Sequence, residues 1–385
     1  MKKALIISPF FYPEMISTGK YNTDIAQSLV EAGYDITIYC SHPIYPAWVP
    51  CESNAQLKGM KIIRGGGVNR YPSNPMLRRL VLELWFAVFV FRKLLAQKDC
   101  FDLVIPVFPP SLMAISFGLF KRKMGRIVGI VHDLQAVHLS ATGGAIKRLV
   151  GFFINRVEKR SFLACDSIIY LSSEMRSIAS EKFNIALEKS TVIYPFVNID
   201  SFVDEGRLDH IFDKGKKAIV YSGALGDKQC PDDLYDLAKS LTAKRDDVIF
   251  YFFSDGPHYI RLRNGNNNPS VVFNNLVDEE DIGELLIRSD IQILPQAPGT
   301  ASASLPSKLP NILASGTRLF VITDPKSEIE TLLSRVETCV ISNTWETGVN
   351  CNNIDKMLDS AVTKIIDNDI MSLFVKDRLI DLMKG

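Results

Sequence analysis

The stretch Ala303-Ser304-Leu305-Pro306-Ser307-Lys308-Leu309-Pro310-Asn311-Ile312-Leu313-Ala314-Ser315-Gly316 lies between two short apolar runs, 290–295 and 318–323, each of which predicts a buried strand. It therefore predicts a small-residue loop that opens into a helix, where backbone N–H groups and the positive end of the helix converge. Lys308 adds a positive charge there, and Asn311 falls one turn further along on the same face. This arrangement suits a diphosphate that carries a sugar or a ribose. The structural alternative is a helix start capped by Ser307, with Lys308 in solvent.

Composition limits the classes of protein to consider. A length of 385 residues predicts two domains, and 47% hydrophobic with 23% charged residues is typical of a soluble globular protein. A net charge of +1 gives no overall attraction for nucleic acid. Seven scattered cysteines without a CxxC pair indicate reduced cytoplasmic thiols. Residues 1–9 hold too short an apolar run for a signal peptide, which needs about 7–15 residues, so they predict a first strand.

The chain starts with the pattern of a βαβ unit. Residues 4–8 predict a strand, 20–31 a helix that ends at Gly33, and 35–40 the next strand. In open α/β sheets ligands bind at the carboxyl ends of the strands, which places the loop 9–19, with Gly19, at a candidate site. Gly19 alone is a weak signal, because a lone glycine before a helix more often serves simple relief of the backbone.

A very apolar segment, 77–93, is flanked by basic residues. Its uninterrupted apolar part has eight residues, whereas a membrane-spanning helix needs about 20. Two interpretations remain. The segment lies on a membrane surface, with its basic residues toward anionic headgroups, or it is a helix buried against the sheet. A second basic cluster at 121–126 favours the membrane contact.

The first half ends with one conspicuous pair of polar residues. Residues 126–131 predict a strand that carries His132 and Asp133 at its carboxyl end, where an imidazole and a carboxylate project toward a bound substrate. A structural role is the alternative for this pair, and His138 is a weaker candidate. After strands at 166–171 and 191–196, the polar residues 198–216 predict a linker.

The second half repeats this organisation. Strands at 217–221, 248–253 and 270–273 precede, respectively, a loop with Lys228, a turn with Asp255 and Gly256, and a loop with Asn275. We therefore expect three strand-end loops, which carry Lys228, Asp255 with Gly256, and Lys308 with Asn311, to converge on one edge of a second parallel sheet. The expected boundaries are an acceptor-binding domain at 1–197, the linker at 198–216, a nucleotide-sugar-binding domain at 217–365, and a helical tail at 366–385 that packs on the first domain.

The order of these motifs resembles the retaining glycosyltransferases of family four. The motifs are Tyr12-Pro13-Glu14 with Thr18-Gly19, then His132-Asp133, Ser222-Gly223 with Lys228, Asp255-Gly256-Pro257, and Leu305-Pro306-Ser307-Lys308 with Asn311 and Gly316. Within that family the sequence is similar to the colanic acid and O-antigen sugar transferases of bacterial surface polysaccharide synthesis, such as the colanic acid fucosyltransferase. The resemblance spans about residues 1–345 and implies the GT-B fold, an α/β fold of two Rossmann-like domains that face each other across a cleft.

The resemblance also implies roles for the candidate residues. The second domain is expected to hold a nucleoside-diphosphate sugar, and Lys228 and Lys308 neutralise the leaving diphosphate. Gly19 lets the first-domain loop approach it. His132 contacts the transferred sugar, while Asp133 orients that sugar or the acceptor. Further donor-binding residues are Asp255, Gly256, Asn275, Ser307 and Asn311.

Three departures from the family pattern concern the donor site. Asn311 stands where many members have a glutamate that binds the ribose hydroxyls, and Ala224 stands beside the phosphate lysine where many have an arginine. The segment 300–303 offers no carboxylate for the first glutamate of the family's pair.

The five histidines and the carboxylates show no metal-ligand spacing, so we expect no metal and no cofactor besides the donor substrate.

The expected function is transfer of a GDP- or UDP-linked sugar, with a fucose-like sugar as one candidate, to a lipid-linked oligosaccharide. The expected location is the cytoplasm, peripherally at the inner face of the plasma membrane, with no nucleic acid as partner. Two alternatives remain: a non-catalytic scaffold that binds nucleotide sugars, and a nucleotide-sugar epimerase or other dinucleotide-binding enzyme. The second is disfavoured, because Gly65-Gly66-Gly67 does not form a GxGxxG fingerprint.

Overall fold

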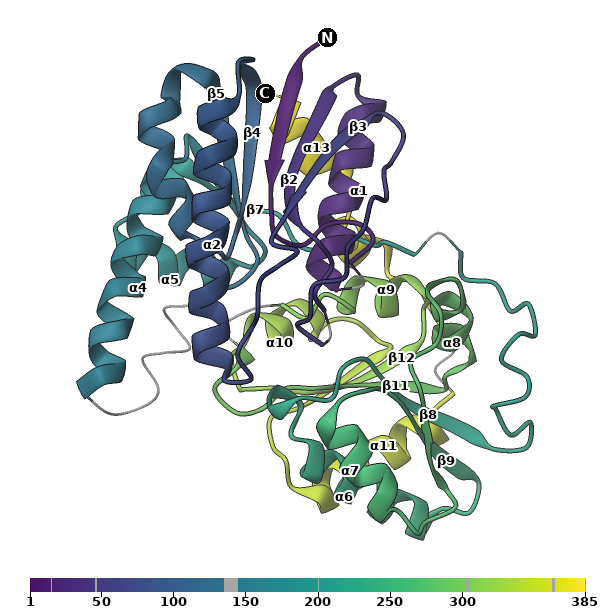
Figure 1. Ribbon diagram of the computed structural model, residues 1–385. Coiled ribbons are helices and arrows are strands. Elements are labelled where there is room, and N and C mark those ends of the chain that lie inside the picture. Colours follow the sequence, from purple (N-terminus) through teal and green to yellow (C-terminus); the bar gives the residue numbers. More distant parts are fainter. Residues whose placement is uncertain are drawn as a thin grey trace. The chain divides into compact units, whose positions relative to one another are not determined.

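The computed structural model describes residues 1–14, 16–45, 47–134, 145–199, 201–301, 305–361 and 364–384. At residues 75 and 145–150 it describes the backbone alone. The chain forms two compact units. The first comprises Met1–Tyr194 together with Lys376–Gly385, and the second comprises Pro195–Val375. Each unit is an α/β layer structure built on a parallel sheet (Figure 1).

The first unit contains a seven-stranded parallel sheet in the order β3-β2-β1-β4-β5-β6-β7. Its strands are β1 (Lys3–Ile7), β2 (Asp35–Ser41), β3 (Met60–Gly65), β4 (Phe101–Phe108), β5 (Met124–Val131), β6 (Ser167–Tyr170) and β7 (Ser190–Val192). Its helices are α1 (Ser17–Glu31), α2 (Pro75–Ala96), the 3-10 helix η1 (Leu112–Lys123), α4 (Ala145–Leu163), α5 (Ser173–Phe183), the 3-10 turn η2 (Leu187–Lys189) and α13 (Asp377–Lys384). The strand order reverses between β1 and β4, so right-handed crossovers place α1 on one face of the sheet and α2 on the other.

The second unit repeats the topology with six parallel strands in the order β10-β9-β8-β11-β12-β13. The strands are β8 (Lys217–Ser222), β9 (Val248–Phe253), β10 (Val271–Asn274), β11 (Ile291–Pro295), β12 (Arg318–Ile322) and β13 (Cys339–Ser342). The helices are η3 (Asp227–Gln229), α6 (Pro231–Lys244), α7 (Pro257–Gly265), η4 (Glu279–Asp281), α8 (Ile282–Arg288), α9 (Leu309–Ala314), α10 (Glu328–Leu333), α11 (Thr347–Asp359) and α12 (Asn368–Met371). Here the order reverses between β8 and β11.

Several bounds differ from the sequence-based expectations. The strand expected at 191–196 is the short β7 (Ser190–Val192). The boundary between the units falls after Tyr194, and the C-terminal residues divide: α12 lies in the second unit and α13 in the first, where it contacts α1.

The stretch 198–216, expected as a linker, is part of the second unit. Leu208 is buried in a core cluster with Val220 and Leu285. The buried Glu284 accepts a hydrogen bond from the Leu208 amide at 2.9 Å. Strand periodicity is absent from this stretch because its contacts are made by single anchoring residues rather than by a repeating face.

Candidate functional site

The strongest constellation lies at the switch point of the second sheet, where loops leave the carboxyl ends of β8 and β11. Ligands of doubly wound sheets bind at such points. Lys308 follows β11, and its Nζ donates a hydrogen bond to the carbonyl of Ser222 at the end of β8, at 2.9 Å. The same ammonium lies 4.4 Å from the centroid of the Tyr221 ring. Lys308 is therefore held against the β8 loop, which contradicts the alternative of a lysine in solvent.

The surroundings of the Lys308 ammonium favour a bound anion. Burial lowers the pKa of its ammonium to about 7, and none of the described carboxylates forms an ion pair with it. Gly223 has φ of +126°, and a Cβ added to this glycine would lie 3.9 Å from the Lys308 Nζ, so the backbone of the β8 loop passes close to the ammonium. A buried ammonium without a counter-charge is a costly arrangement that a bound phosphate would relieve.

The loops around Lys308 are tied to one another. The Ala297 amide, after β11, donates to the carbonyl of Lys228 at 2.7 Å, and the Gly223 amide donates to the Phe253 carbonyl at 2.9 Å. His258, in the first turn of α7, pairs with Asp227 at 2.9 Å. The structure thus brings together the loops after β8, β9 and β11. The side chain of Lys228 is exposed on this edge.

Other predicted donor-binding residues border the same loops. Asp255 is exposed, and its Oδ1 accepts a hydrogen bond from the Gly256 amide at 2.6 Å. Gly256 has φ of +105° and is the N-cap residue of α7. Asn275 is exposed after β10 and accepts from the Tyr259 hydroxyl at 3.4 Å. Ser307 is exposed and does not cap the helix. The N-cap position of α9 is Lys308, without a side-chain cap, so the structural alternative of a helix capped by Ser307 is wrong.

Asn311 is engaged within the second unit. Its Oδ1 accepts from the Asn198 amide at 3.0 Å, and its Nδ2 donates to the Asn198 Oδ1 at 2.7 Å. This reciprocal pair attaches the start of the second unit to α9. A ribose diol at Asn311 must share or displace the Asn198 contact, a competition that the sequence does not reveal.

Sequence reasoning missed four residues that shape this site. Tyr221 lies under Lys308, Asn198 holds Asn311, and His258 ties α7 to the loop after β8. Asp324, after β12, accepts hydrogen bonds from the Gly299 amide at 2.9 and 3.0 Å and so anchors the loop after β11. None belongs to a recognisable motif, and only the positions of Tyr221 and Asp324 beside strand ends could have suggested them.

In the first unit, Gly19 lies in the first turns of α1, where a side chain would not fit. A Cβ on Gly19 would be 2.8 Å from the backbone oxygen of Glu14. Glu14 is buried, and its carboxylate accepts from the amides of Ile44 at 3.0 Å and Tyr45 at 2.6 Å. Gly19 therefore permits close packing of the loop after β1, which Glu14 in turn connects to the loop after β2.

His132 lies at the carboxyl end of β5, as predicted, and its ring meets the Tyr21 ring of α1 edge-on at 4.8 Å. Burial lowers the pKa of His132 to about 4, against the opposing effect of Asp133. The imidazole is therefore neutral at pH 7, and its buried Nε2 has no hydrogen-bond partner among the described residues. Asp133 follows it and is half-buried. The candidate His138 lies outside the described residues.

The apolar segment 77–93 forms most of α2, and one face of this helix is buried, as the second of the two interpretations predicts. Leu82, Phe86, Val90 and Leu94 pack against the unit, whereas Leu77, Leu80, Leu84, Val88, Phe91 and Leu95 form an exposed apolar stripe. Leu84 is 51% and Leu95 is 63% exposed. Across the described part of the chain, every helix is too short or too polar to span a membrane.

The second basic cluster is largely used within the first unit. Lys121 pairs with Asp166 at 3.1 Å, and Lys123 donates to the carbonyl of Leu94 at 3.0 Å. Arg126 donates to the Leu382 carbonyl of α13 at 3.0 Å. Arg122 is exposed. The surface charge of this cluster is thus smaller than its sequence suggests.

Comparison with known proteins agrees with this geometry. Residues 18–201, slightly under half of the chain, match the family model described as Glycosyltransferase Family 4. A protein of Escherichia coli (strain K12), provisionally named the colanic acid biosynthesis glycosyl transferase WcaI, is 27% identical in an alignment 354 residues long. The match covers 85% of this chain and 84% of that protein.

Solved structures share the whole fold. WaaG, a glycosyltransferase involved in lipopolysaccharide biosynthesis, superposes with a TM-score of 0.72 at 12% identity, over 99% of this chain and 100% of that chain. Sucrose-phosphate synthase from Thermosynechococcus elongatus gives 0.72 at 13% identity, over 100% of this chain and 98% of that chain. The predicted α/β fold of two Rossmann-like domains is confirmed.

The fold is that of the GT-B glycosyltransferases. In sequence, the chain is similar to Glycosyltransferase Family 4 over residues 18–201, and over most of its length to a protein named as a glycosyl transferase of colanic acid biosynthesis.

Proposed function

We propose that this protein is a glycosyltransferase that moves a sugar from a GDP- or UDP-linked donor to a lipid-linked oligosaccharide, with retention of the anomeric configuration. The observation that carries the donor proposal is Lys308, a buried ammonium without a carboxylate partner among the described residues, at the switch point of the second sheet. Diphosphate is the anion that this position and the neighbouring Lys228 suit, because both loops leave the strand ends that flank the reversal.

The proposed chemistry needs charge neutralisation at the leaving group. As the bond between sugar and diphosphate breaks, negative charge develops on the diphosphate, and two ammonium groups placed there stabilise it. Asp255, Gly256, Asn275, Ser307 and Asn311 border the same edge and are proposed to contact the donor. In the first unit, the neutral His132 is proposed to hydrogen-bond to the transferred sugar through its unpartnered Nε2, and Asp133 to orient the sugar or the acceptor.

A thermal-shift panel of GDP, UDP and their sugars tests this proposal. Ligands that bind the folded state stabilise it by mass action, by about 2.7 kcal/mol at a ligand concentration of 100 Kd. The melting temperature rises as a result. We expect one base to stabilise the protein, with or without EDTA, because lysines rather than a metal supply the positive charge. If a nucleotide binds but no lipid-linked acceptor is glycosylated, the chain is a nucleotide-sugar-binding scaffold. If no nucleotide shifts the melting temperature, the donor site is wrong.

We further propose that the exposed stripe of α2 lies in the membrane interface, at the inner face of the plasma membrane. The stripe is apolar along the whole helix, and the exposed Arg79 and Arg92 flank it. An apolar helical face with flanking cations is typical of interfacial helices. The lipid-linked acceptor is then delivered without leaving the bilayer.

Replacing two stripe leucines tests the membrane contact. We expect Leu80→Glu/Leu84→Glu to lower binding to vesicles with anionic lipid by at least about tenfold, because two buried apolar groups are lost and two repelled charges are gained. Sedimentation with vesicles measures the bound fraction. Leu187→Glu, an exposed leucine of η2, serves as a control with the same chemical change. Equal binding by the double variant and the wild type would contradict the proposal.

A further inference from the structure

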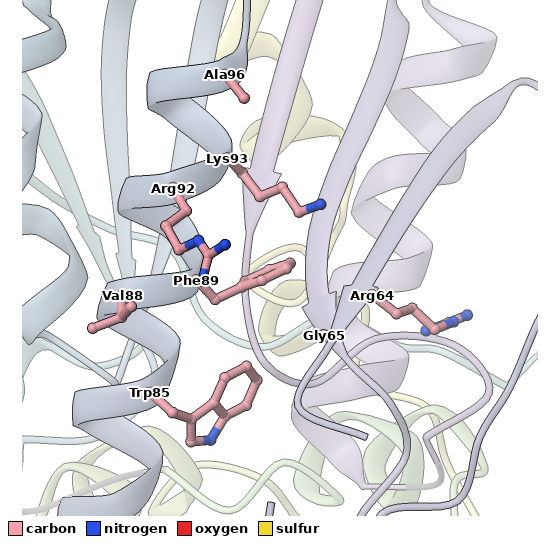
Figure 2. Close-up of a pocket in the computed structure, with 8 residues that line it drawn as sticks. All are labelled: Arg64, Gly65, Trp85, Val88, Phe89, Arg92, Lys93 and Ala96. Carbon is pink, nitrogen blue, oxygen red and sulfur yellow. The ribbon is translucent and has the colours of Figure 1, made fainter. Parts of the chain in front are cut away.

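A pocket of about 510 Å³ lies in the first unit between the end of β3 and the helix α2 (Figure 2). Its volume is within the range of about 300–1,000 Å³ that is typical of small-molecule sites. Trp85, Val88 and Phe89 supply apolar walls, and Arg92 and Lys93 supply positive charge. The strand-end loops of the proposed sugar transfer do not line it.

The aromatic walls rest directly on a glycine backbone. A Cβ on Gly65 would lie 2.6 Å from the Phe89 ring, and one on Gly66 would lie 2.8 Å from the Trp85 ring. The Trp85 indole also donates a hydrogen bond to the Tyr71 hydroxyl at 2.7 Å. Because both rings are fixed in this way, the pocket exists before a ligand arrives, which lowers the ordering cost of binding.

Two of the three cations at the pocket are available to an anion. Arg64 already donates to the carbonyls of Tyr12 at 2.7 Å and Ala55 at 3.0 Å, and Figure 2 shows its side chain directed away from α2. Arg92 and Lys93, in contrast, form no ion pair with any described carboxylate. Lys93 lies 5.6 Å from the Phe89 ring centroid, so its ammonium stays near the apolar wall.

The negative end of the α2 dipole does not cancel these charges. Arg92 and Lys93 are in the last turns of α2, where free carbonyls would repel an anion. The ammonium of Lys123 supplies the counter-charge to these carbonyls, since it donates to that of Leu94 at 3.0 Å and also to that of Gln97. The end of the helix is thereby capped, and the pocket keeps a net positive character.

The pocket is continuous with the exposed stripe of α2, because Val88 belongs to both. A ligand that matches both features has an anionic head and a long apolar tail. We propose that this pocket binds the phosphate or diphosphate group of a single membrane lipid, with Arg92 and Lys93 on the phosphate and the first part of the chain over Trp85 and Phe89. This inference rests on the proposed function in one respect, because it takes the bound lipid to be the carrier of the acceptor.

Farnesyl diphosphate is a suitable probe, since it combines an isoprenoid chain with a diphosphate. Calorimetric titration of the full chain without vesicles is expected to show saturable binding. Farnesol and inorganic diphosphate, which each carry one of the two features, are expected to bind at least about tenfold more weakly. Arg92→Gln/Lys93→Gln is expected to weaken farnesyl diphosphate binding by at least about tenfold, because two charge-assisted contacts are lost.

Two controls make the result specific. Arg79→Gln/Lys98→Gln makes the same change of charge on and just after α2 but outside the pocket, and should bind like the wild type. Lys308→Met should also bind like the wild type, which excludes capture of the diphosphate at the donor site. Unchanged affinity of the pocket variant, or equal affinity for inorganic diphosphate, would overturn the proposal.

The same preparations separate this inference from the donor proposal. The pocket variant should keep the nucleotide-induced thermal shift of the wild type, which also shows that it is folded. If the wild type lacks that shift but binds farnesyl diphosphate through Arg92 and Lys93, the donor site alone is wrong. If nucleotides bind and farnesyl diphosphate does not, the lipid pocket alone is wrong.

Discussion

Lys308→Met is expected to abolish the nucleotide-induced thermal shift and to lower kcat/KM for sugar transfer by about 100- to 1,000-fold. The loss is of the size found when one group that stabilises a developing oxyanion is removed. The melting temperature of the unliganded variant should equal or exceed that of the wild type, because methionine fills a similar volume without the cost of burying an ammonium beside the Tyr221 ring. Enzyme kinetics and thermal unfolding of the same preparations measure both effects.

A pH series gives this variant a second readout. Burial holds the pKa of the unliganded Lys308 at about 7, whereas a bound diphosphate favours the ammonium, so binding takes up a proton above that pH. Affinity for the nucleotide should fall with increasing pH above about 7, by up to tenfold per unit, while the phosphates, with a second pKa of about 6, stay ionised. Titrations of Lys308→Met should lose this slope.

The lowered pKa of Lys308 also makes the free energy of unfolding depend on pH. The pKa of Lys308 in the folded protein, about 7, lies below the ordinary value of 10.5, so the unfolded chain binds more protons between these values. The unliganded wild type should therefore gain stability relative to Lys308→Met as the pH rises through this window. A flat difference between the two proteins would show that Lys308 is not buried as a charge, and would remove the basis for its assignment to the diphosphate.

Gly19→Ala is expected to lower the rate of transfer by about 100-fold while leaving nucleotide binding intact. The new Cβ would be 2.8 Å from the backbone oxygen of Glu14 and 3.2 Å from its Cβ, so the loop after β1 must move. A displacement of about 1 Å near reacting groups can cost this factor in rate. Overpacking of this kind also destabilises by roughly 1–3 kcal/mol. Initial rates with a lipid-linked acceptor and nucleotide thermal shifts are the measurements.

Gly151→Ala is the matched control for this substitution. Gly151 lies in α4, where an added Cβ meets nothing within 4 Å, and alanine favours a helix by roughly 0.5–1 kcal/mol over glycine. This variant should be as active as the wild type and slightly more stable. A fully active Gly19→Ala variant would show that the exact path of the loop after β1 is unimportant for transfer, and that Gly19 serves only the packing of α1.

Much of the fold follows from local sequence patterns. Apolar runs of four to eight residues alternate with helical periodicity in both halves, which is sufficient to predict parallel strands and their approximate order along the chain. The strand-end positions of Lys228, Asp255 and Lys308 follow from that alternation, because each residue lies in the loop that succeeds an apolar run. The expected convergence of their loops needed one further rule, that carboxyl ends of parallel strands share an edge.

The bounds of irregular segments could not be predicted in the same way. The stretch 198–216 has no periodic face, yet Leu208 is buried and Glu284 fixes its backbone. Such anchoring depends on which residues of α8 lie opposite, and the Glu284 of α8 is 76 positions away from Leu208 along the chain. For this reason the polar composition of 198–216 predicted a linker, although the segment is packed against the second unit.

Local sequence patterns are sufficient to predict two doubly wound α/β halves and lysines after the strands at the edge of the second sheet. The contacts of the functional residues are visible in the folded protein alone: Lys308 with the Ser222 carbonyl, Asn311 with Asn198, and the rings of Trp85 and Phe89 against the glycines at the end of β3. The two kinds of information differ in their range along the chain. Periodicity records burial along one element, whereas hydrogen bonds between residues 86 and 113 positions apart depend on the packing of complete sheets and loops.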